Sequence, residues 1–211
     1  MAKKVKIGIK VPTSSELNRR YGNLLINPST QEMPKLWLPS RFLALNYQYG
    51  GGIPFGKILE VMGQSSSGKS LIAYDFAYCT QQLGGHVIWV DAEQSWDNSW
   101  AEQNGIELDK VTLINSTEIE TISDAIADLS ILWRSKLTHN EPILIVVDSI
   151  AAMDCTENIN IKMTDGKAEM GGRAKALYKM FRIRTELLSK LGITQIYINQ
   201  LRVALNVGFG Q

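Results

Sequence analysis

One stretch of the sequence combines glycines, a lysine and hydroxyl side chains at a spacing suited to holding phosphate. Two glycines let the backbone curl until successive N–H groups point at one anion. A lysine in such a loop reaches the β- and γ-phosphates, and the hydroxyl beside it holds Mg²⁺. The stretch follows the pattern G-x-x-x-x-G-K-S and consists of Gly63, Gln64, Ser65, Ser66, Ser67, Gly68, Lys69 and Ser70.

The sequence on either side of this loop supplies the strand and the helix that it needs. Residues 58–62 form an apolar run typical of a buried strand, and residues 71–77 can open a helix. The N-terminus of that helix adds the positive end of its dipole to the phosphate site. The alternative is a Gly/Ser surface turn, but this context favours a nucleotide-binding loop, with ATP and Mg²⁺ as the expected cofactors.

Two acidic residues that follow later apolar runs could act on the same phosphate. Asp148 comes after four aliphatic residues, and its carboxylate would hold Mg²⁺ through water or through Ser70. Glu93 lies two residues past the end of a strand that we expect beside the strand of the loop, where it could polarise a water. The alternatives are a helix cap for Asp148 and a solvated surface position for Glu93.

The pattern of apolar residues predicts the elements that would bring these side chains together. Because strands and helices alternate, we predict an α/β fold of the P-loop type, a mostly parallel sheet with helices on both faces. Ligands bind at the carboxyl ends of such strands. We therefore expect the loop at 63–70 to meet the polar strand ends at 91–93, 148–149 and 199–200. The predicted strands are residues 57–62, 86–90, 111–115, 142–147 and 194–198.

Two of the predicted helices have more specific patterns. Thr117 and Glu120 are spaced as a capping box, and apolar residues follow at helical spacing as far as Trp133. The later helix, which ends near Leu191, has an apolar stripe that we expect to face the core. Its members are Ala174, Leu177, Phe181, Leu188 and Leu191.

Charge and composition exclude several other classes of function. The 211 residues include 22 Lys and Arg and 21 Asp and Glu, a net charge of +1, so any surface for nucleic acid must be local. No apolar run is long enough to span a membrane, and no secretory signal follows the basic N-terminus. Cys79 and Cys155 lie far apart and outside any metal-ligand spacing. We expect them to be packing residues in a reduced, cytoplasmic setting.

Residues 1–36 differ from the rest of the chain. They carry seven Lys and Arg residues against two Glu residues, three prolines and no sustained periodicity. We predict a basic N-terminal arm with one short helix near residues 15–21, capped by Ser14 or Ser15, ahead of a core domain at 37–211. The arm is either a solvated tail or a segment that packs on a neighbouring subunit or contacts a polyanion.

Taken in order, these motifs resemble those of the RecA family of homologous-recombination ATPases, including its phage members. The resemblance covers residues 40–211 and extends beyond the phosphate-binding loop. It rests on GGIPFGKILE at 51–60, QSSSGKS at 64–70, DAE at 91–93, VVDSIAA at 146–152, MGGRAK at 170–175 and INQLR at 198–202.

The resemblance implies roles at the nucleotide for individual residues. It makes Glu93 the catalytic carboxylate, with Lys69 at the phosphates, and Gln200 the polar sensor that detects the γ-phosphate. It places adenine contacts at Asp97 and Trp100, where the indole could stack on the base. Without the resemblance, Asn199 and Gln200 are a polar strand end, and Trp96 and Trp100 are core residues; for Trp96 we keep that interpretation.

The resemblance also implies two DNA-binding loops. The polar connection at 154–170 is longer than is usual in a compact domain, and it matches the first loop. Met170, Gly171 and Gly172 would bring the backbone close to nucleic acid. The second loop would start at Leu201, with Arg202 near its start and Phe209 able to stack against bases. A basic helix face between the loops could neutralise phosphates, or could simply be solvated; it consists of Arg173, Lys175, Lys179 and Arg182.

The resemblance thus implies an ATP-dependent recombinase of a bacterial or phage-infected cell. Such a protein assembles into a helical filament on single-stranded DNA and pairs it with homologous duplex DNA in recombination and repair of DNA damage, with DNA-dependent ATP hydrolysis. The match stops within the second DNA loop, so the core is incomplete at its C-terminal end. Two alternatives remain: a RecA-fold helicase or clock-type ATPase domain, and a nucleotide-binding filament subunit without turnover.

Overall fold

The computed structural model of the protein describes residues 13–21, 36–160 and 171–201. The chain divides into two units, residues 1–35 and 36–211. The first contains helix α1 (Ser14–Tyr21). Thr13 caps it, because its hydroxyl accepts from the Glu16 N–H at 3.3 Å while the Glu16 carboxylate accepts from the Thr13 N–H at 2.9 Å. The cap predicted at Ser14 or Ser15 is therefore wrong. The two reciprocal bonds of a capping box join residues three positions apart, and Thr13 lies three positions before Glu16. Apart from Leu36, the rest of the predicted arm lies outside the described residues.

Five parallel strands form the main sheet of the second unit, which confirms the predicted α/β fold. The strand order is β3-β7-β6-β4-β5, and every neighbouring pair is parallel. Strands β4 and β6 are buried along their whole length, as the unbroken apolar run of β6 predicts for a central strand. The strands are β3 (Ile58–Gly63), β4 (His86–Asp91), β5 (Val111–Ile114), β6 (Ile143–Asp148) and β7 (Thr194–Gln200).

The expectation that β4 lies beside the strand of the phosphate-binding loop is wrong. Strand β3 pairs with β7, and β6 separates β7 from β4. The chain leaves β3 through a helix and skips two positions, which later strands fill. Strands consecutive in sequence are neighbours in only about two-thirds of cases, and nothing local in the sequence marks a skipped position.

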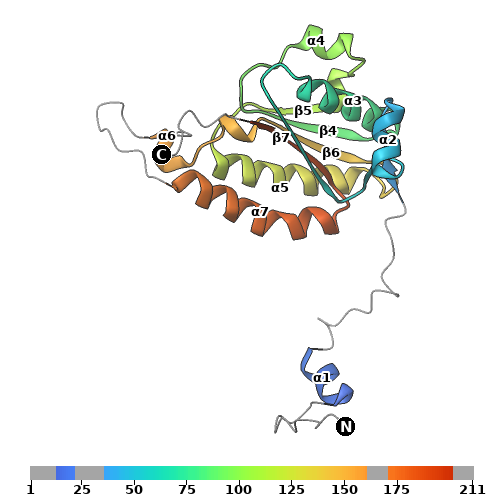
Figure 1. The fold of residues 1–211 in the computed structure, drawn as a ribbon, viewed down its shortest axis with the longest axis vertical. Helices are drawn as coiled ribbons and strands as arrows, with labels where there is room; N and C mark the ends of the chain where they lie inside the picture. Colours follow the sequence, from blue (N-terminus) through green and yellow to red (C-terminus); the bar gives the residue numbers. More distant parts are fainter. Residues whose placement is uncertain (1–12, 22–35, 161–170, 202–211) are drawn as a thin grey trace, which may run out of the picture. The chain divides into compact units, whose positions relative to one another are not determined.

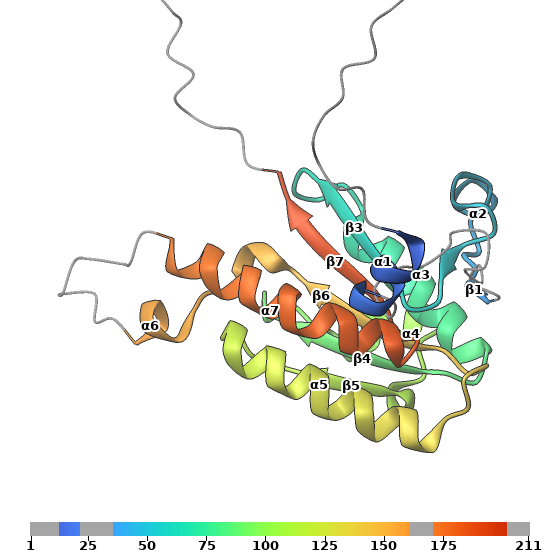
Figure 2. The same cartoon turned by 90° about the horizontal axis from the view of Figure 1, so that it is seen from below.

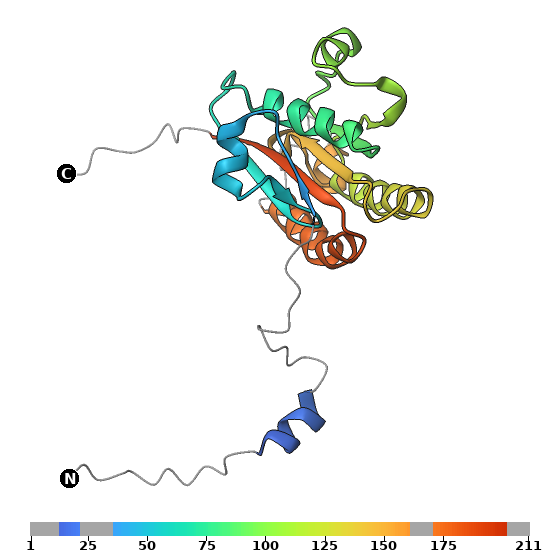
Figure 3. The same cartoon turned by 90° about the vertical axis from the view of Figure 1, so that its right-hand side faces the viewer.

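Helices cover both faces of the sheet (Figure 1 and Figure 3). Helix α3 (Lys69–Gln82) packs on one face, while α5 (Ile119–Lys136) and α7 (Gly172–Lys190) lie side by side on the other (Figure 2). Strand β6 shows how alternation divides its side chains between two cores. Ile143, Ile145 and Val147 pack in the core of α5 and α7, whereas Leu144 and Val146 pack in that of α3.

Shorter elements complete the second unit. Strands β1 (Trp37–Leu38) and β2 (Ile53–Pro54) form an antiparallel pair that was not predicted, since two residues are too few to show a period. Helix α2 (Leu43–Tyr49) lies between them in the sequence. The other short helices are α4 (Asn98–Gln103), η2 (Leu108–Lys110), η3 (Ile150–Ala152) and α6 (Thr156–Ile159).

Two details of the helix predictions are wrong. Helix α5 begins after Glu118, without a side-chain cap, because Glu120 accepts hydrogen bonds from the N–H and hydroxyl of Thr156, both at 3.1 Å. In α7, Ala174 is exposed, and the stripe that reaches the core instead centres on Ala176, Met180 and Leu188. The other predicted members of that stripe pack beside it.

Both cysteines behave as the sequence predicts. Cys79 and Cys155 are free thiols, each buried in one of the two cores. In the ranges that the structure describes, no helix combines the length and the apolar character needed to cross a membrane.

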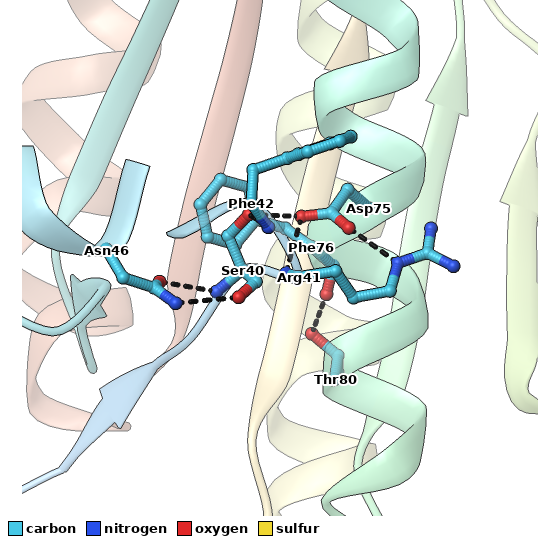
Figure 4. Close-up of polar contacts among 7 residues, drawn as sticks. All are labelled: Ser40, Arg41, Phe42, Asn46, Asp75, Phe76 and Thr80. Carbon is cyan, nitrogen blue, oxygen red and sulfur yellow. Dashed lines mark hydrogen bonds and ion pairs between the residues drawn. The ribbon is translucent and has the colours of Figure 1, made fainter. Parts of the chain in front are cut away.

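A buried carboxylate joins the segment before α2 to helix α3 (Figure 4). Asp75 on α3 is 1% exposed. It accepts from the Ser40 hydroxyl at 2.5 Å, from the Arg41 N–H at 3.2 Å and from Arg41 Nε at 2.7 Å. Asn46 exchanges two hydrogen bonds of 2.7 Å with the backbone of Ser40 and so braces the same segment. We call this group of four residues the Asp75 cluster.

His86, at the start of β4, should make the stability of the fold sensitive to acid. Its ring is buried, stacks on Trp133 at 3.5 Å between centroids and lies 2.8 Å from the Thr112 hydroxyl through Nε2. Burial, and secondarily the charge of Lys136, lower the pKa of His86 to about 4. The unfolded chain binds this proton near pH 6.5. It therefore binds more protons than the native state between about pH 6.5 and pH 4, so the free energy of unfolding should fall as the pH is lowered through that window.

Urea unfolding at pH 7.0 and pH 5.0 measures this effect. The loss of stability between the two pH values should be smaller in His86→Gln than in the wild-type chain. His139→Gln, which removes an exposed imidazole, is the matched control and should keep the wild-type loss. Equal pH dependence in all three proteins would contradict the prediction.

Candidate active site

The phosphate-binding loop connects β3 to α3, and its backbone is shaped as a cradle. Gly68 precedes α3 with φ +84°, a left-handed conformation that favours glycine. A Cβ at Gly63 would lie 2.6 Å from the Ser67 hydroxyl oxygen, closer than real Cβ atoms come, so a larger residue there would require the Ser67 side chain to turn away. The residues between these glycines are exposed. The loop is therefore curled and open to a ligand.

The side chains of Lys69 and Ser70 converge beside this cradle. Lys69 is only 8% exposed, and its Nζ donates to the Gln64 carbonyl at 2.6 Å, so the ammonium group is held back against the loop. The Ser70 hydroxyl donates to Asp148 Oδ2 at 2.7 Å. The sequence-predicted lysine, hydroxyl and acid thus lie at one place, although 78 residues separate Ser70 from Asp148.

Asp148 ends β6 and has the electrostatics of a cation ligand. Burial raises the pKa of its carboxyl group, and the charges of Glu93 and Asp91 add to this, while the Ser70 hydrogen bond and Lys69 lower it. A buried carboxylate near two other carboxylates gains from a positive ion. A hydroxyl and a carboxylate oxygen are hard donors that suit Mg²⁺, which also keeps waters and takes phosphate oxygens. Across the described ranges, no group of three or more His, Cys, Asp or Glu residues is arranged as a metal site by itself.

Glu93 reaches the same edge of the sheet, although its strand is not next to β3. The ends of β4 and β6 are paired, Asp91 opposite Asp148, and Glu93 N–H donates to the Asp148 carbonyl at 3.2 Å. Oε1 of Glu93 accepts from Gln200 Nε2 at 2.7 Å and from the Ser149 hydroxyl. Gln200 on β7 pairs with Gly63 at the end of β3. Gln200 therefore bridges the Glu93 carboxylate and the phosphate-binding loop.

Asp97 and Trp100 lie at the start of α4. Asp97 is the N-cap of this helix and accepts from the Trp100 N–H at 2.9 Å. Burial raises the pKa of Tyr74 on α3 to about 12, and the charges of Asp148, Asp91 and Asp97 add to the shift. The ring of Trp96, the residue before Asp97, lies 5.8 Å from that of Tyr74, so this segment lies beside α3. The Trp100 indole is 51% exposed and therefore free to stack on a base.

Trp96 packs against the core, as predicted, although it is only partly buried. Its ring packs edge-on to Trp89 at 5.1 Å and tilts against Tyr74 at 5.8 Å. Tyr74 in turn stacks on Trp89 at 4.6 Å. This aromatic group fixes the segment that follows β4, between the active-site carboxylate and α4.

Three residues of the site had no role assigned from the sequence. Asp91 accepts from the N–H groups of Ser95 and Trp96 at 3.0 and 2.9 Å, and so holds the turn that carries Glu93. Asp91 and Ser149 were recognisable only as polar strand ends. Tyr74 gave no signal at all, because its spacing on α3 is that of an ordinary buried residue.

The predicted DNA-contacting residues fall into separate groups. Gly171 precedes α7 with φ +95°, and Gly172 begins the helix. Lys175, Lys179 and Arg182 are exposed at positions i, i+4 and i+7 of α7, which lie on one face. We call these three residues the basic face.

Arg173 points away from the basic face. It is partly buried, and its Nη2 donates to the Ile150 carbonyl at 2.8 Å. The helical period explains this, since position 173 is about half a turn from Lys175. Met170, Arg202 and Phe209, with most of both predicted DNA loops, lie outside the described residues.

Comparison with known proteins identifies the family. The family model of the RecA N-terminal domain matches residues 13–211. Protein RecA of Leifsonia xyli is 30% identical over 203 residues, which cover 95% of this chain and 54% of the relative. Protein RecA of Geobacter sulfurreducens is 32% identical, and that of Salinispora arenicola 33%, each over 174 residues; these cover 82% of this chain and 49% and 47% of the relatives. The chain thus spans about half the length of the curated relatives it matches, and it belongs to the RecA family.

Proposed function

We propose that this chain is the nucleotide-binding core of an ATP-dependent recombinase that binds single-stranded DNA and promotes pairing with a homologous duplex. The observation that carries the proposal is the hydrogen bond from Gln200 to Glu93 at 2.7 Å, at the edge of the sheet where Lys69, Ser70 and Asp148 also meet. It links the candidate water activator to the strand end from which residue 201 continues. The match to the RecA family favours this function over a helicase or clock-type ATPase.

The proposed reaction is hydrolysis of ATP to ADP and phosphate. Water attacks the γ-phosphorus, the bond from that phosphorus to the bridging oxygen of ADP breaks, and Glu93 accepts a proton from the water. Lys69 and the backbone of the loop hold the phosphates. Ser70 and Asp148 would hold Mg²⁺, which neutralises charge on the phosphates when it is bound. Asp97 and Trp100 would contact the adenine.

Gln200 couples the nucleotide to DNA in this proposal. Its amide donates to Glu93 in the structure, and the same N–H group can donate to a γ-phosphate instead. A ligand that binds one of two arrangements better shifts the population toward it. ATP would therefore favour the arrangement in which Gln200 turns to phosphate, and would change the segment that begins at Leu201. The basic face of α7 would then contact the DNA backbone without reading its sequence.

The remaining expectations extend the proposal to the cell. We propose that residues 37–211 are the ATPase core, that residues 1–36 are a self-association arm, and that copies assemble into a helical filament on DNA. We also propose a cytoplasmic site of action, in recombination and in the repair of damaged DNA, with Met170 and Arg202 among the DNA contacts.

Fluorescence anisotropy of labelled poly-dT tests the DNA-binding step. ATPγS with Mg²⁺ should tighten binding by about tenfold over the nucleotide-free chain, within the usual range of coupling between sites. Removal of two phosphate contacts in Lys175→Gln/Lys179→Gln should reduce the slope of log K against log salt by about 1.4, because each contact on a single strand contributes about 0.7.

Lys57→Gln/Lys136→Gln is the matched control, since it removes two exposed charges that lie outside α7. It should keep the wild-type slope. Binding of poly-dT that does not respond to ATPγS would contradict the proposed function, and equal slopes for both double variants would exclude the basic face as the DNA contact.

A further inference from the structure

Ser149 has a buried hydroxyl at the active site that the proposed reaction does not use. It follows Asp148 at the end of β6 and is 1% exposed. Its hydroxyl donates to Oε1 of Glu93, the oxygen to which Gln200 Nε2 also donates. Among the described residues, Oε2 of Glu93 has no hydrogen-bond partner. One oxygen of the carboxylate is therefore anchored twice, and the other is left to act on water.

The two anchors differ in how firmly they are held. Ser149 is buried and has a single side-chain torsion between its backbone and its hydroxyl oxygen. Gln200 is only partly buried at the end of β7, and its longer side chain can turn about more bonds. The N–H groups of Ala92 and Glu93 donate to the Asp148 carbonyl at 2.9 and 3.2 Å, so the backbone beneath the carboxylate is tied to the residue that precedes Ser149.

We propose that Ser149 is a positioning residue for hydrolysis, which keeps Oε1 of Glu93 in place when Gln200 turns to the γ-phosphate. Oε2 then stays directed at the attacking water in the state that reacts. The inference rests on the proposed function, in which Glu93 activates water and Gln200 senses phosphate. Because Ser149 bonds to the carboxylate and not to the phosphate-binding loop, its loss acts on the chemical step rather than on nucleotide affinity.

Steady-state ATP hydrolysis by the 211-residue chain, with Mg²⁺ and poly-dT, measures this effect. Ser149→Ala should lower kcat about 10- to 100-fold, the scale expected when a reacting group shifts by about 1 Å. The KM and the Kd of a fluorescent ATP analogue should stay within about twofold of the wild-type values, because no ground-state contact is lost. Ser149→Thr keeps a hydroxyl and should restore part of the lost kcat.

A double-mutant cycle with Glu93→Gln separates positioning from a purely structural role. In the Glu93→Gln chain, Ser149→Ala should cause no further fall in single-turnover rate, because the two residues act as a unit. Ser130→Ala is the matched control, since it removes a buried hydroxyl on α5 that has no hydrogen-bond partner among the described residues, and it should leave kcat unchanged.

The outcomes separate this inference from the proposed function. A wild-type kcat in Ser149→Ala, or an equal fall in both backgrounds of the cycle, would overturn the inference alone. A wild-type chain that binds nucleotide and DNA but shows no turnover above Glu93→Gln would overturn ATP hydrolysis as the function, and the role of Ser149 with it.

Discussion

Replacement of Lys69 by alanine should weaken ATP binding by at least about 30-fold. The ammonium group is largely buried, and the Gln64 carbonyl at 2.6 Å holds it against the loop. With ATP bound, this ammonium group would form a buried, hydrogen-bonded charge pair with the phosphates. Loss of one partner from such a pair costs about 2–5 kcal/mol. At tenfold per 1.4 kcal/mol, this corresponds to about 30-fold to several thousand-fold in affinity. Titration with a fluorescent ATP analogue in the presence of Mg²⁺ measures the change.

Two further variants show whether the effect belongs to this lysine. Lys57→Ala removes an exposed lysine just before β3 and should bind the analogue as the wild-type chain does. Lys69→Arg keeps the charge but replaces a compact ammonium with a planar group, so it should bind less tightly than the wild-type chain and more tightly than Lys69→Ala. Thermal unfolding of Lys69→Ala verifies that it is folded. If that folded variant keeps wild-type affinity, the loop at 63–70 does not hold the phosphates.

The parts of the site that are local in sequence could be predicted from the sequence. The loop from Gly63 to Ser70 carries its own backbone requirements, and the apolar runs that become β3 and β6 mark the strands beside it. Asp148 follows such a run directly, so its position at the carboxyl edge followed from the fold class alone. For these residues, the neighbouring sequence determines which loop or strand end they occupy.

Contacts between distant segments could not be predicted from the residues alone. Glu93 meets Gln200 across 107 residues, because β7, which follows the other four strands in the sequence, lies between β3 and β6 in the sheet. Propensity and periodicity do not specify strand order, and here the expected neighbour of β3 was wrong. Ser149 and Tyr74 escaped notice for the same reason, since their partners lie on other strands and helices. Arg173 could have been separated from the basic face by a stricter count of the helical period.

The Asp75 cluster is the clearest contact between segments that are distant in the sequence. Loss of its carboxylate should lower the free energy of unfolding more than any other single substitution proposed for this protein. Asp75 accepts three hydrogen bonds from Ser40 and Arg41, which lie 35 and 34 positions away in the sequence, respectively. Removal of one partner from a buried ion pair costs about 3–5 kcal/mol. The Arg41 side chain is 43% exposed and can turn to water, so we expect the lower end of that range for Asp75→Ala.

A change of about 3 kcal/mol lowers the Tm of a chain of this length by about 6–12 °C, which differential scanning calorimetry resolves. Asp124→Ala is the matched control, because Asp124 also pairs with an arginine, Arg184, but its side chain is 77% exposed. A surface pair of that kind contributes at most about 1 kcal/mol. The Ser40 hydroxyl and the Arg41 N–H lose a buried acceptor only in Asp75→Ala. If the two variants unfold at the same temperature, the attachment of residues 40–46 to α3 does not depend on this carboxylate. The contacts left to brace the segment are then the hydrogen bonds between the Asn46 side chain and the Ser40 backbone, and the Arg41 guanidinium over the Tyr78 ring of α3.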